Sequence, residues 1–117
     1  MKTAWITGAC GFTGQNLAKE LAARGHEVRC IDRSEKDLPE DFPGTRLHLD
    51  LMDDQQVLKN MQREKPAMIF HLAAQSSGAL SFKEPRATLR NNLESTLSLL
   101  EALRVIKEEG AALLERN

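Results

Sequence analysis

Apolar residues gather in four short runs, and longer segments of helical periodicity separate or follow them. The runs predict buried strands over residues 4–7, 27–31, 46–49 and 67–72. The segments 14–24, 53–65 and 85–109 repeat apolar residues at helical spacing. Helix signals stand at their borders: Gly25 after the first segment, Asp53 and Gln56 in capping-box spacing, and Pro85 in a first turn. This alternation predicts an α/β domain with a parallel sheet and right-handed crossovers.

Three further patterns complete this picture. Segment 33–45 holds Pro39, Pro43 and Gly44, which indicates a loop with at most one helical turn. The final residues, AALLERN, are helix formers without β-branched side chains, so we expect a last helical turn or two and not a fifth strand. In the last long helix, leucines recur at steps of four and three, and we expect this stripe to face the core: Leu89, Leu93, Leu97, Leu100 and Leu103.

Composition narrows the class of protein. The 117 residues suit a single domain, and 41% hydrophobic with 28% charged residues is ordinary for a soluble chain. A net charge of -1 gives no electrostatic footprint for nucleic acid or for an acidic membrane surface. No run approaches the roughly 18 apolar residues of a membrane-spanning helix. The first three residues lead directly into a strand without a signal-peptide pattern, so we expect a cytoplasmic protein.

The two cysteines and three histidines do not predict a disulfide framework or a metal site. We interpret Cys10 and Cys30 as two reduced, small apolar residues, although neighbouring strands could also bring them together as a bridge. His26 and His48 are expected at the surface, and His71 lies in an apolar run typical of a core or helix-packing histidine. No carboxylate or cysteine spacing joins these histidines into a metal site, so none is predicted.

Three glycines, Gly8, Gly11 and Gly14, lie between the first strand and the first helix. Glycine permits a tight turn and close approach of a pyrophosphate, which the helix N-terminus then attracts through its free N–H groups and dipole. Asp32 ends the second strand, 18 residues after Gly14, where a carboxylate can bind both hydroxyls of an adenosine ribose. This favours NAD over NADP, although the adjacent guanidinium of Arg33 could instead receive a 2′-phosphate.

The segment ITGACGFTG resembles the TGxxGFxG loop of the extended short-chain dehydrogenase/reductase family, the NAD-dependent epimerases and dehydratases of nucleotide sugars. Asp50-Leu51, the segment HLAAQ, and Pro85, Asn92 and LLEA are similar to further motifs of that family, although Ser95-Thr96 stands where Gly-Thr is usual. The sequence around AAQSSGALSF is most similar to the branch of the family that acts on GDP-mannose derivatives. The resemblance and the glycine loop together imply these cofactor-binding residues: Gly8, Gly11, Phe12, Thr13, Gly14, Asp32, Arg33, Asp50, Leu51, Leu72, Ala73, Ala74 and Gln75.

The resemblance covers residues 3 to about 105 and implies half of a Rossmann fold, a doubly wound parallel sheet of about four strands in the order 3-2-1-4 with flanking helices. It matches only the N-terminal part of the family fold, so residues 1–117 are expected to form one truncated dinucleotide-binding domain. The family's general acid/base is the tyrosine of a Tyr-x-x-x-Lys pair, and this chain contains no tyrosine. Ser76, Ser77 and Ser81 follow His71, but we expect solvated or helix-capping roles for them, and no catalytic residue is assigned.

These observations favour a non-catalytic NAD(P)-binding module, with NAD the first choice and NADP the second. The alternative is an epimerase, dehydratase or reductase of nucleotide sugars whose missing residues come from another chain. A third interpretation is a structural α/β scaffold whose glycine loop is vestigial and binds no nucleotide. The family's sheet order also places the fourth strand at an open edge, because no fifth strand follows. We therefore expect a homodimer through this edge, unless the C-terminal helix covers it.

Overall fold

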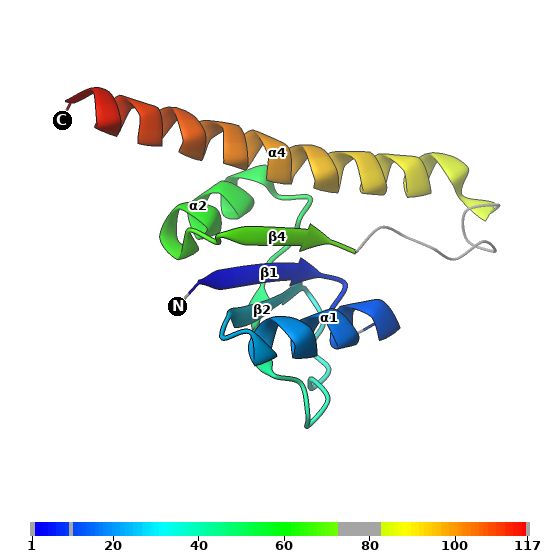
Figure 1. Cartoon of the computed structure of the whole chain (residues 1–117). Helices are drawn as coiled ribbons and strands as arrows, with labels where there is room; N and C mark the ends of the chain where they lie inside the picture. Colours follow the sequence, from blue (N-terminus) through cyan, green and yellow to red (C-terminus); the bar gives the residue numbers. More distant parts are fainter. Residues whose placement is uncertain (1, 10, 73–82, 117) are drawn as a thin grey trace.

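The computed structural model describes residues 2–9, 11–72 and 83–116, with side chains described as far as residue 110. Its elements are β1 (Thr3–Thr7), α1 (Phe12–Ala23), β2 (Glu27–Asp32), β3 (Gly44–His48), α2 (Asp54–Glu64), β4 (Met68–His71) and α4 (Pro85–Arg116). The strands pair in parallel in the order β3-β2-β1-β4 (Figure 1). The predicted half-Rossmann sheet and its strand order are therefore confirmed.

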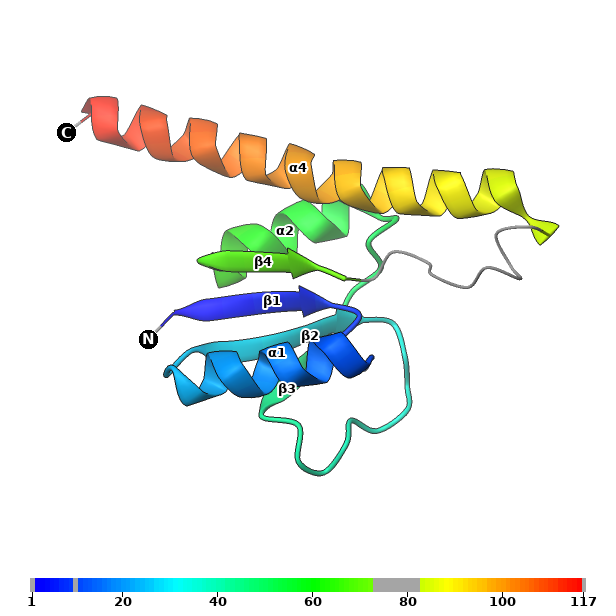
Figure 2. The ribbon, with the colours of Figure 1, turned by 45° about the vertical axis from the view of Figure 1, so that its right-hand side comes forward.

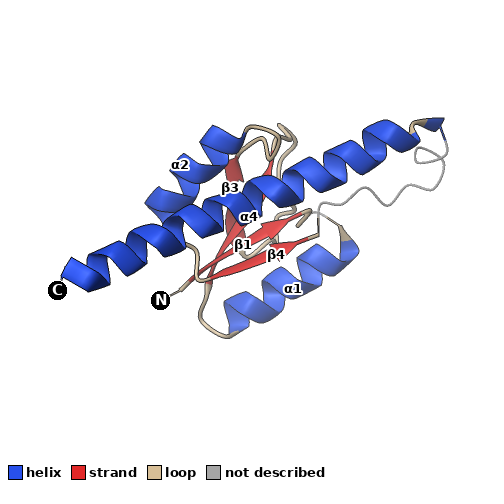
Figure 3. Cartoon of the chain, turned by 90° about the horizontal axis from the view of Figure 1, so that it is seen from above, coloured by secondary structure: helices blue, strands red, loops and turns tan. Residues whose placement is uncertain are grey.

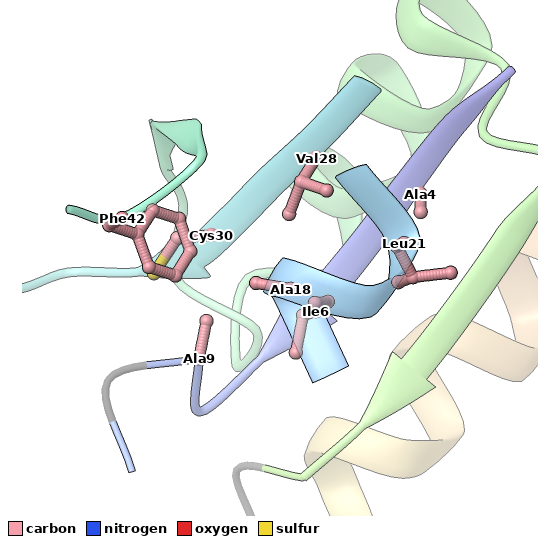
Figure 4. Close-up of a cluster of buried hydrophobic side chains, with 8 residues drawn as sticks. All are labelled: Ala4, Ile6, Ala9, Ala18, Leu21, Val28, Cys30 and Phe42. Atoms are coloured by element: carbon pink, nitrogen blue, oxygen red, sulfur yellow. The ribbon is translucent and has the colours of Figure 1, made fainter. Parts of the chain in front are cut away.

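Helices cover both faces of the sheet, with α1 on one face and α2 and α4 on the other (Figures 1 and 3). Successive side chains of a strand point to opposite faces, so β1 contributes to both layers. Ala4 and Ile6 face α1, where they meet Ala18 and Leu21 of that helix. Figure 4 shows this cluster, which Ala9, Val28, Cys30 and Phe42 complete.

The second core lies between the sheet and the helices α2 and α4. Trp5 of β1 is fully buried at its centre, and Ile31 of β2 packs in the same cluster. Val57 and Met61 reach this cluster from α2, and Leu99 and Ala102 reach it from α4. The spacing of four between Val57 and Met61 places both side chains on one face of α2. The alternation along β1 thus determines which helices the sheet holds on each face.

The helix ends follow the expected residues. Asp53 accepts a hydrogen bond from the N–H of Gln56 at 3.2 Å, which confirms the N-terminal cap of α2. Gly25 has a φ of +86°, and its N–H donates to the carbonyl of Ala22 while the N–H of His26 donates to Leu21. This pair of bonds is the Schellman arrangement, which uses glycine because the left-handed conformation is unfavourable for other residues. The segment 33–43 is a loop that contains no helix.

The C-terminal tail is helical, as expected, but it continues α4 and forms no separate turn. α4 runs through Gly110 to Arg116 and extends past the sheet at both ends (Figures 1 and 2). Gly110 is exposed, and a Cβ built on it would meet no atom within 4 Å. The described helices contain no segment long and apolar enough to cross a membrane.

The leucine stripe of α4 does not face the core, so that prediction was wrong. The five leucines are between 41% and 68% exposed: Leu89, Leu93, Leu97, Leu100 and Leu103. The side of α4 that packs inward carries Thr88, Ser95, Ser98, Leu99 and Ala102, each at most 9% exposed. Four of these five residues are small, which lets the helix approach the layer beneath it closely around Leu99. The helical period alone does not say which face is packed.

β4 forms one edge of the sheet, as expected from the strand order. Met68 and Phe70 pack against the α1-side core, and Ile69 packs against the other core. All four residues of the strand are half-buried. The backbone of β4 pairs with β1 on its inner side.

Candidate functional site

An open cleft of about 480 Å³ lies at the carboxyl ends of β1 and β2. In the strand order β3-β2-β1-β4, the chain turns in opposite directions on the two sides of β1, and α/β proteins bind ligands at this switch point. The glycine loop, the end of β2, the turn after β3 and the first part of α4 all contribute. The lining residues are Gly8, Ile31, Asp32, Arg33, Leu49, Asp50, Leu51, Met52, Asn91, Asn92 and Ser95.

Gly11 and Gly14 of the loop differ in what the fold requires of them. A Cβ on Gly14 would lie 2.6 Å from both the Ala9 Cα and the Gly8 carbonyl oxygen, so the packing of α1 against the loop requires glycine there. A Cβ on Gly11 would meet only the Gly8 oxygen, at an ordinary 3.6 Å. The backbone of Gly11 is extended, with φ −73° and ψ 168°, which any residue adopts. The folded chain therefore tolerates a side chain at Gly11 but not at Gly14.

The N-terminus of α1 has the features of an anion site. Gly11 is its N-cap and supplies no side-chain cap, and the first turn holds no acidic residue. The first N–H groups of an α-helix have no partner within the helix, and they carry the positive end of its dipole. Phe12 and Thr13, which begin the helix, are exposed.

Asp32 ends β2 and turns its carboxylate toward the cleft, where its side chain is 25% exposed. Oδ1 accepts a hydrogen bond from the N–H of Ser34 at 3.0 Å and lies 2.7 Å from Nε of Arg46. The thiol of the buried Cys30 donates to Oδ2 at 3.3 Å. Because a carboxylate offers about four acceptor sites and a thiol is a weak donor, a ribose hydroxyl can compete for Oδ2.

Arg33 and Asp50 meet across the mouth of the cleft. Nη1 of Arg33 lies 3.4 Å from Oδ2 of Asp50, and the Arg33 side chain is 68% exposed. Oδ1 of Asp50 accepts from the N–H of Met52 at 2.9 Å, which holds the turn that carries Leu51. At this exposure the ion pair is weak, so the Arg33 guanidinium can move to another anion at little cost.

His71 joins β1, β4 and α4 next to the cleft. Nδ1 lies 2.8 Å from the Thr7 hydroxyl, and Nε2 lies 3.5 Å from the hydroxyl of Ser95, a cleft residue of α4. Burial lowers the pKa of His71 below its usual value, because desolvation disfavours the charged ring. The helix-packing role expected for this histidine is confirmed.

The structure gathers most of the sequence-predicted site at one place. Gly8, Asp32, Arg33, Asp50 and Leu51 line the cleft, and Gly11, Phe12, Thr13 and Gly14 form the loop and first turn of α1. Leu72, which follows β4, is 38% exposed and its N–H donates to the Thr7 carbonyl at 3.1 Å. Ala73, Ala74 and Gln75 lie outside the described residues, as do Ser76, Ser77, Ser81 and Cys10.

Sequence reasoning missed several residues that line the cleft. Asn91, Asn92 and Ser95 come from α4, and the expectation that its leucine stripe faces the core gave no reason to place them at a cleft. Asn92 belongs to one of the family motifs, but only the packing of α4 shows that it borders the cleft. Among the described residues, no group of three or more His, Cys, Asp or Glu side chains could hold a metal ion.

A parallel sheet, a glycine-rich turn before a helix and a carboxylate at the end of the next strand define an α/β domain of the nucleotide-binding class. The family model of the NAD-dependent epimerase/dehydratase family matches residues 4–113. The chain therefore belongs to that family.

The relatives that this chain matches are longer than the chain itself. A GDP-mannose 4,6-dehydratase of Vibrio cholerae is 36% identical over 90% of this chain and 32% of its own length. The UDP-glucose 4-epimerase of Brucella ovis, solved with NAD, is 27% identical, with a TM-score of 0.78 over 92% of this chain and 33% of that one. The NAD complex of the Thermus thermophilus UDP-glucose 4-epimerase is 31% identical, with a TM-score of 0.74 over 87% and 33%. The chain thus spans about a third of the length of these relatives.

Proposed function

We propose that this chain is an NAD-binding module that corresponds to the cofactor-binding part of a nucleotide-sugar epimerase or dehydratase. One observation carries the proposal: Gly8 of the glycine loop, Asp32 and Asp50 all border the same cleft at the switch point of the sheet. Family membership and the NAD-bound relatives support it.

The described residues suit the adenosine diphosphate half of the cofactor. The uncapped first turn of α1 offers N–H groups to the pyrophosphate, and Gly11 leaves room for the phosphate to approach. Asp32 offers a carboxylate to the ribose hydroxyls. Apolar Ile31, Leu49 and Leu51 line the same cleft and suit the flat face of an adenine. When bound, NAD would supply hydride-transfer chemistry, which the protein itself lacks.

We propose NAD as the preferred cofactor and NADP as the second. A 2′-phosphate would meet the carboxylate of Asp32, which lines the cleft. Arg33 could compensate by leaving Asp50, because their contact is exposed and 3.4 Å long. Three groups hold the Asp32 carboxylate, whereas only a weak ion pair holds Arg33. The carboxylate that repels a 2′-phosphate is therefore more firmly fixed than the guanidinium that could attract it.

We propose that the chain alone is not catalytic, since it contains no tyrosine to act as the family's acid/base. The alternative is that residues from another chain complete a catalytic site, and it is kept because relatives are named as a dehydratase and an epimerase. Chromatography of the sugar nucleotide detects turnover when NAD and GDP-mannose or UDP-glucose are added, because epimerisation and dehydration return the cofactor to NAD and accumulate no reduced nicotinamide. Turnover by the purified chain would overturn the non-catalytic proposal.

Calorimetric titration with NAD, NADP, ADP-ribose and AMP tests the module directly. We expect ADP-ribose and NAD to bind and to raise the melting temperature by mass action. Gly11→Val and Asp32→Ala should each abolish or strongly weaken that response. Ala23→Lys, on the exposed end of α1 away from the loop, is the control and should keep it. Failure of all four ligands to bind the wild-type chain would defeat the proposal.

We also propose that two copies of the chain associate, as expected from the sequence, but through the leucine stripe of α4 and not through the β4 edge. Five exposed leucines recur along one side of α4, and contiguous exposed apolar side chains are typical of interaction surfaces. From Leu89 to Leu103 the stripe is about 20 Å long at 1.5 Å per residue. The edge of β4 is four residues long and its side chains are half-buried.

Charge along α4 favours an antiparallel contact between the copies. The N-terminal end of the stripe carries a net positive charge, because it has three cationic residues, Lys83, Arg86 and Arg90, and one acidic residue, Glu84. At the other end, Arg104 forms ion pairs with Glu101 and Glu108. Glu109 and Lys107 follow there, so three glutamates outnumber two cationic residues. An antiparallel pair places the positive end of one helix beside the negative end of the other, whereas a parallel pair opposes like charges.

A further inference from the structure

Arg46 of β3 and Asp32 of β2 form a partly buried ion pair beside the cleft. Nε of Arg46 lies 2.7 Å from Oδ1 of Asp32, and the side chains are 16% and 25% exposed. Nε and Nη2 of Arg46 are fully buried atoms. The register of β2 and β3 creates the pair, because it sets Arg46 opposite Cys30, two residues before Asp32 and on the same face of the sheet.

Arg46 also holds the loop that follows β2. Its Nη1 donates to the carbonyl of Lys36 at 2.5 Å, and the N–H of Ser34 in the same loop donates to Oδ1 of Asp32. One guanidinium thus fixes both the carboxylate and the chain beside it. Among the described residues, those that line the cleft include Asp32 but not Arg46. Arg46 can therefore affect a ligand only through Asp32 and this loop.

The burial of Arg46 makes the pair rigid. A guanidinium stays charged at every ordinary pH, and a buried charge without its partner is costly, so Asp32 and Arg46 hold each other in one arrangement. An exposed aspartate has no such restraint and must lose rotamer freedom when a ligand binds. The pair removes that entropic cost before the ligand arrives.

We propose that Arg46 is a positioning residue for ribose recognition: it holds the Asp32 carboxylate where Oδ2 meets the 2′-hydroxyl of a bound adenosine nucleotide. The inference rests on the proposed function, since it requires that the cleft binds the adenosine half of the cofactor. Arg46 itself does not touch the nucleotide. Its contribution is the chain's ability to distinguish a ribose from a 2′-deoxyribose.

The test is calorimetric titration of the purified chain with ADP and with 2′-deoxy-ADP. These ligands share the adenine and both phosphates, so the ratio of their dissociation constants isolates the 2′-hydroxyl. A hydrogen bond to a charged group predicts that the wild-type chain binds ADP about tenfold more tightly than 2′-deoxy-ADP. Arg46→Met should bring this ratio close to one through weaker ADP binding, with 2′-deoxy-ADP affinity changed little. Arg46→Lys keeps the charge without the planar fork and should give an intermediate ratio.

Arg29→Met is the matched control. Arg29 also lies in the sheet, its side chain is 20% exposed, and it forms ion pairs with Glu27 and Glu64 away from Asp32. A merely structural role predicts that Arg29→Met and Arg46→Met lower the melting temperature without changing the ratio. Should Arg46→Met fail to fold, Arg46→Lys provides the test, because it leaves Asp32 in place, keeps the charge and changes only the group that positions the carboxylate. A wild-type ratio in Arg46→Lys would then count against the positioning role.

Three outcomes overturn the inference. A wild-type ratio in Arg46→Met would place Arg46 in a structural role only. Equal binding of ADP and 2′-deoxy-ADP by the wild-type chain would remove the 2′-hydroxyl contact but leave nucleotide binding intact. Absence of binding to either ligand defeats the proposed function and this inference together.

Discussion

Thr7 and His71 connect the inner strand β1 to the edge strand β4 through their side chains, with Oγ1 of Thr7 2.8 Å from Nδ1 of His71. The two residues are paired in the register of β1 and β4. Thr7 is fully buried, and Ser95 of α4 lies on the other side of the imidazole. The histidine therefore links β1, β4 and α4 at the border of the cleft.

This arrangement predicts a pH dependence of stability. Burial lowers the pKa of His71 below its usual 6.5, so the unfolded chain binds more protons than the folded chain in that window. The stabilising contribution is complete above about pH 6.5 and is lost as the pH falls from there through the lowered pKa. Denaturant titrations at about pH 7 and pH 5, monitored by the fluorescence of Trp5, the only tryptophan, should show the loss.

The variant His71→Gln isolates that contribution, because other groups titrate alike in both chains. Its free energy of unfolding should fall less between the two pH values than that of the wild type. His26→Gln is the control and should follow the wild type. Equal slopes for His71→Gln and the wild-type chain would contradict the assigned cause.

Gly11 and Gly14 should separate binding from folding. Gly14→Ala places a Cβ 2.6 Å from backbone atoms of the loop, which predicts a loss of about 1–3 kcal/mol in the free energy of unfolding. Gly11→Ala meets only an ordinary contact, so its stability should be unchanged or slightly raised by the smaller entropy of the unfolded chain. Its ADP-ribose affinity should nevertheless fall about tenfold or more if the Cβ costs one charge-assisted hydrogen bond to the phosphate. Full affinity in Gly11→Ala would show that no phosphate approaches there.

Gly110 and Gly25 should respond in opposite directions to the same substitution. Both are exposed, and an added Cβ meets nothing at either site. Gly110 lies inside α4, so Gly110→Ala should favour the helix by about 1 kcal/mol. Gly25 has a φ of +86°, so Gly25→Ala should destabilise the chain by about 1 kcal/mol. Far-UV circular dichroism and amide exchange over residues 105–116 measure the first effect, and denaturant titration measures the second. A helix that ended before Gly110 would give no increase in protection.

The leucine stripe should control the oligomeric state. Light scattering at high protein concentration should return the mass of a dimer for the wild type and of a monomer for the Leu93→Lys/Leu100→Lys variant. Because both leucines are more than half exposed, the variant should keep its fold. Ala23→Lys adds a charge elsewhere and should leave the dimer intact. A dimer that survives both leucine substitutions would instead point to the β4 edge, and a monomeric wild type would exclude both surfaces.

The sequence was sufficient for the sheet and for half of the cleft. The caps at Asp53 and Gly25 and the convergence of Gly8 with Asp32 follow from local patterns joined to the topology of parallel sheets, and the strand order follows from the family resemblance. The face of α4 could not be predicted in this way, because its packed side holds Ser95, Ser98 and Ala102 beside Leu99, while the five leucines of the stripe face water. Periodicity measures where apolar residues recur, and it contains no information about the distance at which a helix packs.

The ion pair between Asp32 and Arg46 could not be predicted from the sequence, for a different reason. The two residues are 14 positions apart and meet only through the β2–β3 register, which places Arg46 opposite Cys30. A long loop joins these strands, so no local pattern fixes their alignment. Ser95 and Asn92 border the cleft for a similar reason, since their position depends on how α4 crosses the sheet.

Calorimetric titration of the wild-type chain with ADP-ribose, NAD and nicotinamide mononucleotide tests the central claim most directly. The described site suits the adenosine diphosphate half, so ADP-ribose should bind, NAD should bind with similar affinity, and nicotinamide mononucleotide alone should bind far more weakly. Asp32→Ala should weaken ADP-ribose binding. Failure of ADP-ribose to bind would contradict the claim, and NAD binding far more tightly than ADP-ribose would contradict its restriction to the adenosine half.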